Sequence, residues 1–340
     1  MLESITPHAR ARSRWRRARA LTAVALAATT AVGLAACGGD DEKESSKSSG
    51  QSQSSASTAI QKDDTNSGIT ITLGSKNFTE QQVLGEVYAQ ALEAAGYTVK
   101  REFNLGDEKT ALAALKAKQI DAYPEYTGTA LGSFFDVAGD DLPKDAQEAY
   151  QLVKTDFAKE GITALPPTPF TSSNEVAVTQ ATADKYKLTN ISDLASVAGQ
   201  LKLYGSPECR TRNDCLKGLE DVYGLKFKSF TPVDISLRHT VLANKKADVS
   251  IVFTTDPQIA RDKLVLLKDD KGMFPPYNST LLVRDDVLSK AGSDFQKTID
   301  LVNTKLDAKA IQELNAKKDL DKESAADAAK SYLTSFGFVQ

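Results

Sequence analysis

Histidine, cysteine, tryptophan and methionine are scarce in this sequence: the 340 residues contain two, three, one and two of them, respectively. Histidine and cysteine are common in zinc sites and in pairs of a nucleophile with its base. His239 is the only histidine after residue 36, and the sequence has no Ser-His-Asp spacing and no metal-ligand cluster. These absences argue against an extracellular enzyme, so we expect neither catalysis nor a metal or other cofactor.

Basic runs are absent except at the N-terminus, where six arginines precede an apolar stretch that ends Leu34-Ala35-Ala36-Cys37. A basic start, an apolar stretch and small residues before a cleavage point are the layout of an export signal. The ending resembles a bacterial lipoprotein processing site. We predict a signal peptide over residues 1–36 and lipidation of Cys37. A short membrane anchor and plain cleavage near Ala36 are the alternatives.

Positive charge is also lacking in the mature chain, because removal of residues 1–36 lowers the formal net charge from −3 to about −8. An acidic protein without a basic run is not expected to bind nucleic acid. No second apolar run approaches the ~20 residues that span a bilayer. We therefore expect an extracytoplasmic protein that the lipid on Cys37 holds at the outer face of the cytoplasmic membrane.

Cys209 and Cys215 are the two cysteines that remain, an even number in an exported protein. Five residues lie between them, and a disulfide could close so short a loop. Two reduced thiols, or half of a metal site, are the alternatives, but a metal would need further Cys or His ligands. We expect a disulfide.

The mature chain divides into a polar linker and a folded body. Residues 37–68 are rich in Ser, Gly, Gln, Asp and Lys, which is typical of a flexible linker. From residue 69 onward, segments of alternating apolar residues are followed by segments with helical spacing. Repeated strand–helix alternation favours an α/β fold with parallel strands and right-handed crossovers.

Two proline-marked segments divide the folded body. Leu165-Pro166-Pro167-Thr168-Pro169 and Phe274-Pro275-Pro276-Tyr277 cannot continue a helix, and the section after the second holds too little strand to fold alone. We predict that residues 69–171 and 278–340 form lobe 1 and that residues 172–277 form lobe 2. A ligand would then bind in the cleft between lobes that close by a hinge motion.

Two polar turns in lobe 1 form the first candidate site. Gly74-Ser75-Lys76-Asn77-Phe78-Thr79-Glu80-Gln81 follows the first predicted strand, and Tyr123-Pro124-Glu125-Tyr126-Thr127-Gly128-Thr129 contains the end of a later one. Turns at the carboxyl ends of strands bind small ligands in doubly wound sheets. One turn offers a cation and the other offers rings and hydroxyls, so we predict that they face each other across one pocket.

These two motifs, together with Phe-Pro-Pro-Tyr at 274–277 and Thr-Asp-Pro at 255–257, resemble the substrate-binding proteins of osmoprotectant ABC transporters. That family takes up glycine betaine, choline, carnitine and related quaternary amines. The resemblance implies a two-lobed type II periplasmic-binding-protein fold with two hinge crossings. It also implies a small-molecule osmolyte as ligand and the permease subunits of an ABC transporter as partners; we expect a monomer.

The resemblance also implies a binding site. In that family aromatic rings surround the quaternary ammonium group, whose favourable partner is the negative face of a ring, while a cation and hydroxyls hold a carboxylate. Carried over to this sequence, the rings are those of Tyr126, Phe253 and Tyr277. The anion-binding groups are those of Lys76, Thr129 and Arg212. Tyr277 follows two prolines, so we expect its ring to be exposed.

Lobe 2 departs from the family pattern. Ser172 and Asn174, which we also expect to bind the ligand, stand where an acidic residue and a tyrosine are common, and Phe253 stands where a tyrosine is common. A cage short of one ring and one carboxylate leaves open a different ligand, an amino acid or an aromatic compound. A structural surface lipoprotein is a third reading. Arg212 lies inside the Cys209–Cys215 loop, so a disulfide would stiffen the loop that presents it.

Overall fold

The computed structural model describes residues 59–340; the predicted signal peptide, Cys37 and most of the predicted linker lie outside this range. The last part of the predicted linker belongs to the folded body instead. Residues Asp64–Gly68 form the 3₁₀ helix η1, and the buried Asn66 donates a hydrogen bond from Nδ2 to the carbonyl of Ala95 at 2.9 Å. A short polar segment is held here by one buried amide, which a compositional argument does not detect. Within residues 59–340 no helix is long and apolar enough to cross a membrane.

The sheet of lobe 1 has five strands in the order β2-β1-β3-β10-β4. Strand β1 runs parallel to β2 and β3, as the alternation of strands and helices predicts, whereas β10 runs antiparallel to β3 and β4. The strands are β1 (Thr70–Gly74), β2 (Thr98–Glu102), β3 (Ala122–Tyr126), β4 (Ile162–Ala164) and β10 (Ser279–Arg284).

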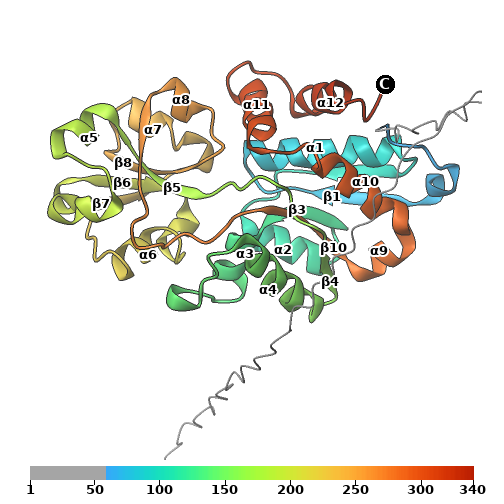
Figure 1. Cartoon of the computed structure of the whole chain (residues 1–340), viewed down its shortest axis with the longest axis horizontal. Helices are drawn as coiled ribbons and strands as arrows, with labels where there is room; N and C mark the ends of the chain where they lie inside the picture. The colour runs from blue at the N-terminus through green and yellow to red at the C-terminus, as the bar shows by residue number, and fades with distance from the viewer. Residues whose placement is uncertain (1–58) are drawn as a thin grey trace, which may run out of the picture. The chain divides into compact units, whose positions relative to one another are not determined.

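Helices cover both faces of this sheet, so β3 and β10 are buried along their length (Figure 1). One face packs against α1 (Thr79–Ala94), α9 (Asp285–Ala291), α10 (Ser293–Asn303), α11 (Ala308–Asp319) and α12 (Ala325–Ser335). The other face packs against α2 (Glu108–Lys116), α3 (Thr127–Phe134) and α4 (Ala146–Ala158), with η2 (Gly139–Asp141) between the last two helices.

The sheet of lobe 2 also has five strands, in the order β7-β6-β8-β5-β9. They are β5 (Asn174–Thr179), β6 (Lys202–Gly205), β7 (Ser229–Pro232), β8 (Val249–Phe253) and β9 (Leu264–Leu267). Its helices are α5 (Gln180–Tyr186), α6 (Leu216–Asp221), α7 (Thr240–Ala243) and α8 (Gln258–Arg261), with η3 (Ile191–Ser196), η4 (Ala198–Gln200), η5 (Pro207–Arg210) and η6 (Ile235–Leu237). The expected α/β class with two sheets is confirmed.

The chain crosses between the two sheets twice, after β4 and before β10, and the two crossing segments lie side by side (Figure 1). Thr171 and Asn278 form an antiparallel bridge, and the backbone N–H of Ser172 donates to the carbonyl of Tyr277 at 3.0 Å. A single short ladder therefore joins the lobes, which is the arrangement that permits a hinge.

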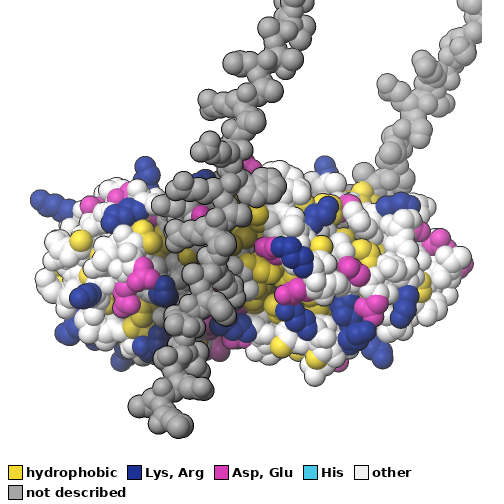
Figure 2. Space-filling model, turned by 90° about the horizontal axis from the view of Figure 1, so that it is seen from below, with side chains coloured by type: hydrophobic (Ala, Val, Ile, Leu, Met, Phe, Trp, Pro, Cys, Tyr) yellow, Lys and Arg dark blue, Asp and Glu magenta, His cyan; other side chains and the backbone are white. Residues whose placement is uncertain are grey.

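Charged side chains of both signs are interspersed on the face of the folded body drawn in Figure 2. Lys and Arg side chains there do not gather into one basic patch.

Candidate functional site

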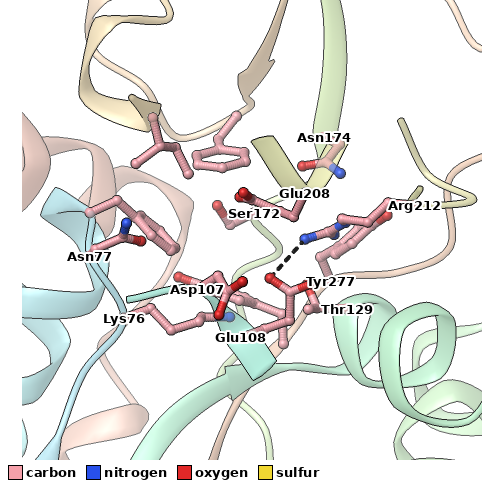
Figure 3. Close-up of a pocket in the computed structure, with 14 residues that line it drawn as sticks. Lys76, Asn77, Asp107, Glu108, Thr129, Ser172, Asn174, Glu208, Arg212 and Tyr277 are labelled. Atoms are coloured by element: carbon pink, nitrogen blue, oxygen red, sulfur yellow. Dashed lines mark ion pairs between the residues drawn. The ribbon is translucent and has the colours of Figure 1, made fainter. Parts of the chain in front are cut away.

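A small cavity lies between the two lobes (Figure 3). All eight residues predicted to bind ligand line it: Lys76, Tyr126, Thr129, Ser172, Asn174, Arg212, Phe253 and Tyr277. Sequence reasoning missed six further lining residues, which are Asn77, Phe78, Asp107, Glu108, Glu208 and Ile235. Residues from both lobes thus converge on one cavity; their role in binding stays a prediction.

Lys76 is buried at the floor of this cavity and forms an ion pair with the buried Glu125. Glu125 also accepts hydrogen bonds from the backbone N–H of Tyr126 at 2.7 Å and from the hydroxyl of Tyr123 at 3.1 Å. Burial raises the pKa of Glu125 although Lys76 opposes the shift. The Lys76 ammonium is therefore already balanced by a protein carboxylate, and its Nζ lies 4.7 Å from the centre of the Tyr126 ring.

Four aromatic rings line the cavity, one more than the resemblance implies. The additional ring belongs to Phe78, which follows β1; its centre lies 5.3 Å from that of Phe253, at the end of β8, and 6.2 Å from that of Tyr126. The Phe78–Phe253 contact joins the two lobes. Phe78 lies inside the Gly74–Gln81 motif, so its place next to Lys76 is the signal that could have identified it.

Tyr277 is buried, with 1% of its surface exposed, so the expectation of an exposed ring is wrong. The ring packs against the backbone of Gly128, where a Cβ would lie 2.6 Å from Tyr277 Cε1. Its hydroxyl donates to Asp214 Oδ2 at 2.6 Å, and burial raises the pKa of this hydroxyl well above its ordinary value. The ring is buried because it packs between Gly128 of lobe 1 and Asp214 of lobe 2.

Arg212 lies in the loop between η5 and α6, and the expected disulfide between Cys209 and Cys215 closes that loop. The guanidinium donates from Nε to Asp214 Oδ1 at 2.8 Å and from Nη2 to Asp214 Oδ2 at 2.5 Å. Burial opposes ionisation of Asp214, but Arg212 outweighs it and holds the pKa of that carboxyl below its ordinary value. The arginine is thus held by a bidentate pair within its own loop.

Three carboxylates that the motifs do not contain also line the cavity (Figure 3). Asp107 caps α2 by accepting from the backbone N–H of Thr110 at 2.8 Å. Glu108 lies 3.5 Å from Nη1 of Arg212, an ion pair between the lobes. The Glu208 side chain, at η5, has no hydrogen-bond or ion-pair partner among residues 59–340. The helix start after β2 and the neighbourhood of Cys209 are the signals that could have pointed to these residues.

Two of the three residues that depart from the family pattern, Ser172 and Asn174, form hydrogen bonds within the protein. Ser172 Oγ lies 2.9 Å from Thr255 Oγ1, and Asn174 donates from Nδ2 to Asp214 Oδ2 at 3.0 Å. Asn174 therefore supports the same carboxylate that holds Arg212, while Thr129 has no side-chain partner in the part of the chain that the structure describes. Rings, one free carboxylate and a free hydroxyl suit a cationic ligand.

Comparisons with known proteins relate this arrangement to one family. The family model for the substrate-binding domain of ABC-type glycine betaine transport systems, OpuAC, matches residues 69–335. A glycine-betaine-binding protein of Pseudomonas aeruginosa is 32% identical over 78% of this chain and 87% of its own length. The ergothioneine transport permease/ergothioneine binding protein EgtU of Helicobacter pylori is 29% identical over 78% of this chain, which spans 48% of that relative.

A solved structure has the same fold. The crystal structure of a glycine betaine/carnitine/choline ABC transporter superposes with a TM-score of 0.63 at 26% identity, covering 78% of this chain and 99% of that chain. The two-lobed architecture predicted from the motifs is therefore also that of a similar solved protein.

Proposed function

This chain belongs to the family of substrate-binding domains of ABC-type glycine betaine transport systems, and from that membership we propose that its ligand is a small molecule with a quaternary ammonium group. The protein is a substrate-binding component of an ABC importer and acts outside the cytoplasm. Its task is to bind the ligand in the cavity between the lobes and deliver it to the permease. The family role is binding rather than catalysis.

The observation that carries this proposal is the convergence of four rings on one cavity: Phe78, Tyr126, Phe253 and Tyr277. A trimethylammonium group has no N–H to donate, so ring faces are its favourable partners, each contributing up to about 2 kcal/mol when water is excluded. Phe78 supplies a ring in place of the one that the departure at Asn174 removes from the family pattern. The amino-acid or aromatic-compound alternative therefore loses its main support.

Contacts between the lobes support a binding cycle with opening and closing. Arg212 meets Glu108 at 3.5 Å, and Gln258 of lobe 2 donates from Nε2 to Asp319 Oδ2 of lobe 1 at 2.8 Å. These contacts lie on either side of the cavity, so the lobes must separate before a ligand can enter. We propose that the paired crossing segments are the hinge.

We also propose that the mature protein is a monomer, tethered by lipid on Cys37 and the linker that follows, with lobe boundaries at residues 171–172 and 277–278. Mass spectrometry of the membrane-extracted protein should find diacylglycerol on Cys37, and Cys37→Ser should release the protein into the medium. A soluble wild-type protein with a free N-terminus beyond Cys37 would contradict the tether. Light scattering should give the mass of one chain.

Calorimetry on the mature protein tests the ligand class. Choline, glycine betaine and carnitine form the panel, and 3,3-dimethylbutanol, which has the shape of choline without its charge, is the matched control ligand. We expect at least one quaternary amine to bind and dimethylbutanol to remain silent, because a ring face attracts the charge. Silence towards every quaternary amine would refute the proposal.

A pair of phenylalanine variants tests the rings. Phe253→Ala should weaken the binding of the quaternary amine by about tenfold or more, since a ring face contributes on the order of 1–2 kcal/mol. Phe336→Ala is the control, because this ring is 39% exposed and lies at the end of α12, away from the cavity. If both variants bind the quaternary amine as tightly as the wild type, the rings do not form the binding site.

A further inference from the structure

The positive charges around the cavity are already balanced by carboxylates of the protein. Lys76 pairs with Glu125 beneath the rings, and Arg212 pairs with Asp214 through two hydrogen bonds. Both carboxylates are buried, so removing either cation from its partner would leave a charge without solvent. A ligand carboxylate would therefore have to share a cation that is already engaged.

Glu208 is in the opposite situation. Its side chain lines the cavity from lobe 2, while Asp107 and Glu108 line it from lobe 1 (Figure 3). Asp107 accepts a hydrogen bond at the N-terminus of α2, and Glu108 contacts Ser133 and Arg212. Glu208 has no donor and no cation within residues 59–340, so its charge faces the cavity uncompensated.

We infer that Glu208 is a specificity-determining residue that makes this cavity prefer a ligand of net positive charge to a zwitterion. This inference rests on the proposed function and sharpens it. A cation among the rings gains attraction from Glu208 and from the carboxylates of lobe 1. In glycine betaine the carboxylate is one methylene from the ammonium group, so a molecule seated in the cavity brings its negative end close to the same carboxylates. The repulsion offsets the gain, whereas the hydroxyl of choline brings no charge.

Arg212 does not cancel this preference. Its Nε and Nη2 are both bound to Asp214, and its remaining amino group lies 3.5 Å from Glu108. A ligand oxygen at that amino group would compete with Glu108 in a region that already holds two carboxylates. A neutral hydroxyl is tolerated there better than an anion.

Calorimetry with choline and glycine betaine tests the inference, using the mature wild type, Glu208→Gln and Glu220→Gln at low ionic strength. Glu220 is an exposed carboxylate on α6 of the same lobe, outside the cavity, and controls for a general change of charge. The wild type should bind choline about tenfold or more tightly than glycine betaine. Glu208→Gln should lower the choline affinity roughly five- to tenfold and leave or raise that of glycine betaine, while Glu220→Gln changes neither.

Two results overturn the inference while the proposed function stands: a wild type that prefers glycine betaine, or a Glu208→Gln variant that weakens both ligands equally. Silence towards both ligands instead overturns the proposed function, and the inference with it. Thermal unfolding verifies that Glu208→Gln is folded, which we expect because its side chain has no partner to lose. The wild-type comparison of the two ligands needs no variant and decides the sign of the preference by itself.

Discussion

Gly128→Ala should disorganise the cavity by displacing the Tyr277 ring that lines it. Gly128 lies in the first turn of α3, and a Cβ there would lie 2.6 and 2.7 Å from two ring carbons of Tyr277 and 2.9 Å from the carbonyl oxygen of Pro276. Real side-chain carbons do not approach so closely, so the Tyr277 ring must move. Gly132, one turn later in the same helix, has no atom within 4 Å of its would-be Cβ.

Both substitutions raise the intrinsic helix propensity, but only Gly128→Ala crowds its neighbours. Alanine gains about 0.5–1 kcal/mol over glycine in a helix, in either position. At Gly128 overpacking costs about 1–3 kcal/mol. A displaced Tyr277 also loses its hydrogen bond to Asp214, worth about 1.5–3 kcal/mol for a charged acceptor. We therefore expect a net loss of about 1.5–5.5 kcal/mol for Gly128→Ala and a gain of up to about 1 kcal/mol for Gly132→Ala.

Thermal unfolding without ligand measures this difference. At about 2–4 °C per kcal/mol for a domain of this size class, Gly128→Ala should melt roughly 3–22 °C below the wild type and Gly132→Ala slightly above it. Calorimetry with choline at 15 °C, where both variants are folded, should then show affinity reduced by about tenfold or more only for Gly128→Ala. If Gly128→Ala melts and binds like Gly132→Ala, the packing of Tyr277 against α3 does not organise the site.

Three further substitutions test other contacts. Tyr277→Phe keeps the ring but removes one of the donors to Asp214, which Arg212 and Asn174 still bond, so denaturant titration should show a loss of about 1.5–3 kcal/mol; unchanged stability would contradict that bond. Burial raises the pKa of Glu175 to about 7, above the unfolded value, so its stabilising contribution is complete below pH 4.5 and is lost as the pH rises through 7. Glu175→Gln should therefore melt above the wild type at pH 8 and near it at pH 4, and equal differences at both pH values would refute the shift. Asp319→Ala removes the acceptor of Gln258 between the lobes, so stopped-flow measurements should show faster ligand dissociation, whereas an unchanged rate would show that this contact does not hold the closed form.

The sequence predicts the fold well wherever the information is local. Alternating apolar residues and helical spacing identify the strands and helices, and the strand–helix order implies the parallel arrangement of β1, β2 and β3. Strand β10 runs antiparallel because the chain returns from lobe 2 before it enters the first sheet. No local sequence pattern indicates the direction of β10. The η1 segment is missed for the same reason, since its one buried residue, Asn66, bonds to a carbonyl 29 residues away.

The candidate site shows the same difference between local and long-range information. The motifs and the family resemblance together pointed to eight lining residues, but neither gives the partners of those residues. Lys76 and Glu125 are 49 residues apart, and Tyr277 and Asp214 are 63 residues apart. A lysine in a recognised turn indicates a cation at the site, whereas only the fold reveals that the cation is already paired. The expectation that Tyr277 is exposed failed similarly, because prolines report backbone direction and not what packs beside it.

These pairings change what a ligand must bring to the cavity. Among the polar side chains that line it, Asn77 and Thr129 of lobe 1 and Glu208 of lobe 2 have no side-chain partner in the described part of the chain. The unused amide and hydroxyl therefore lie in one lobe and the unused carboxylate in the other. A ligand that contacts both groups adds interactions between the lobes that the protein lacks by itself, so its binding free energy favours the closed arrangement. The choice of ligand and the closure of the lobes then both depend on these three side chains, and not on the rings alone.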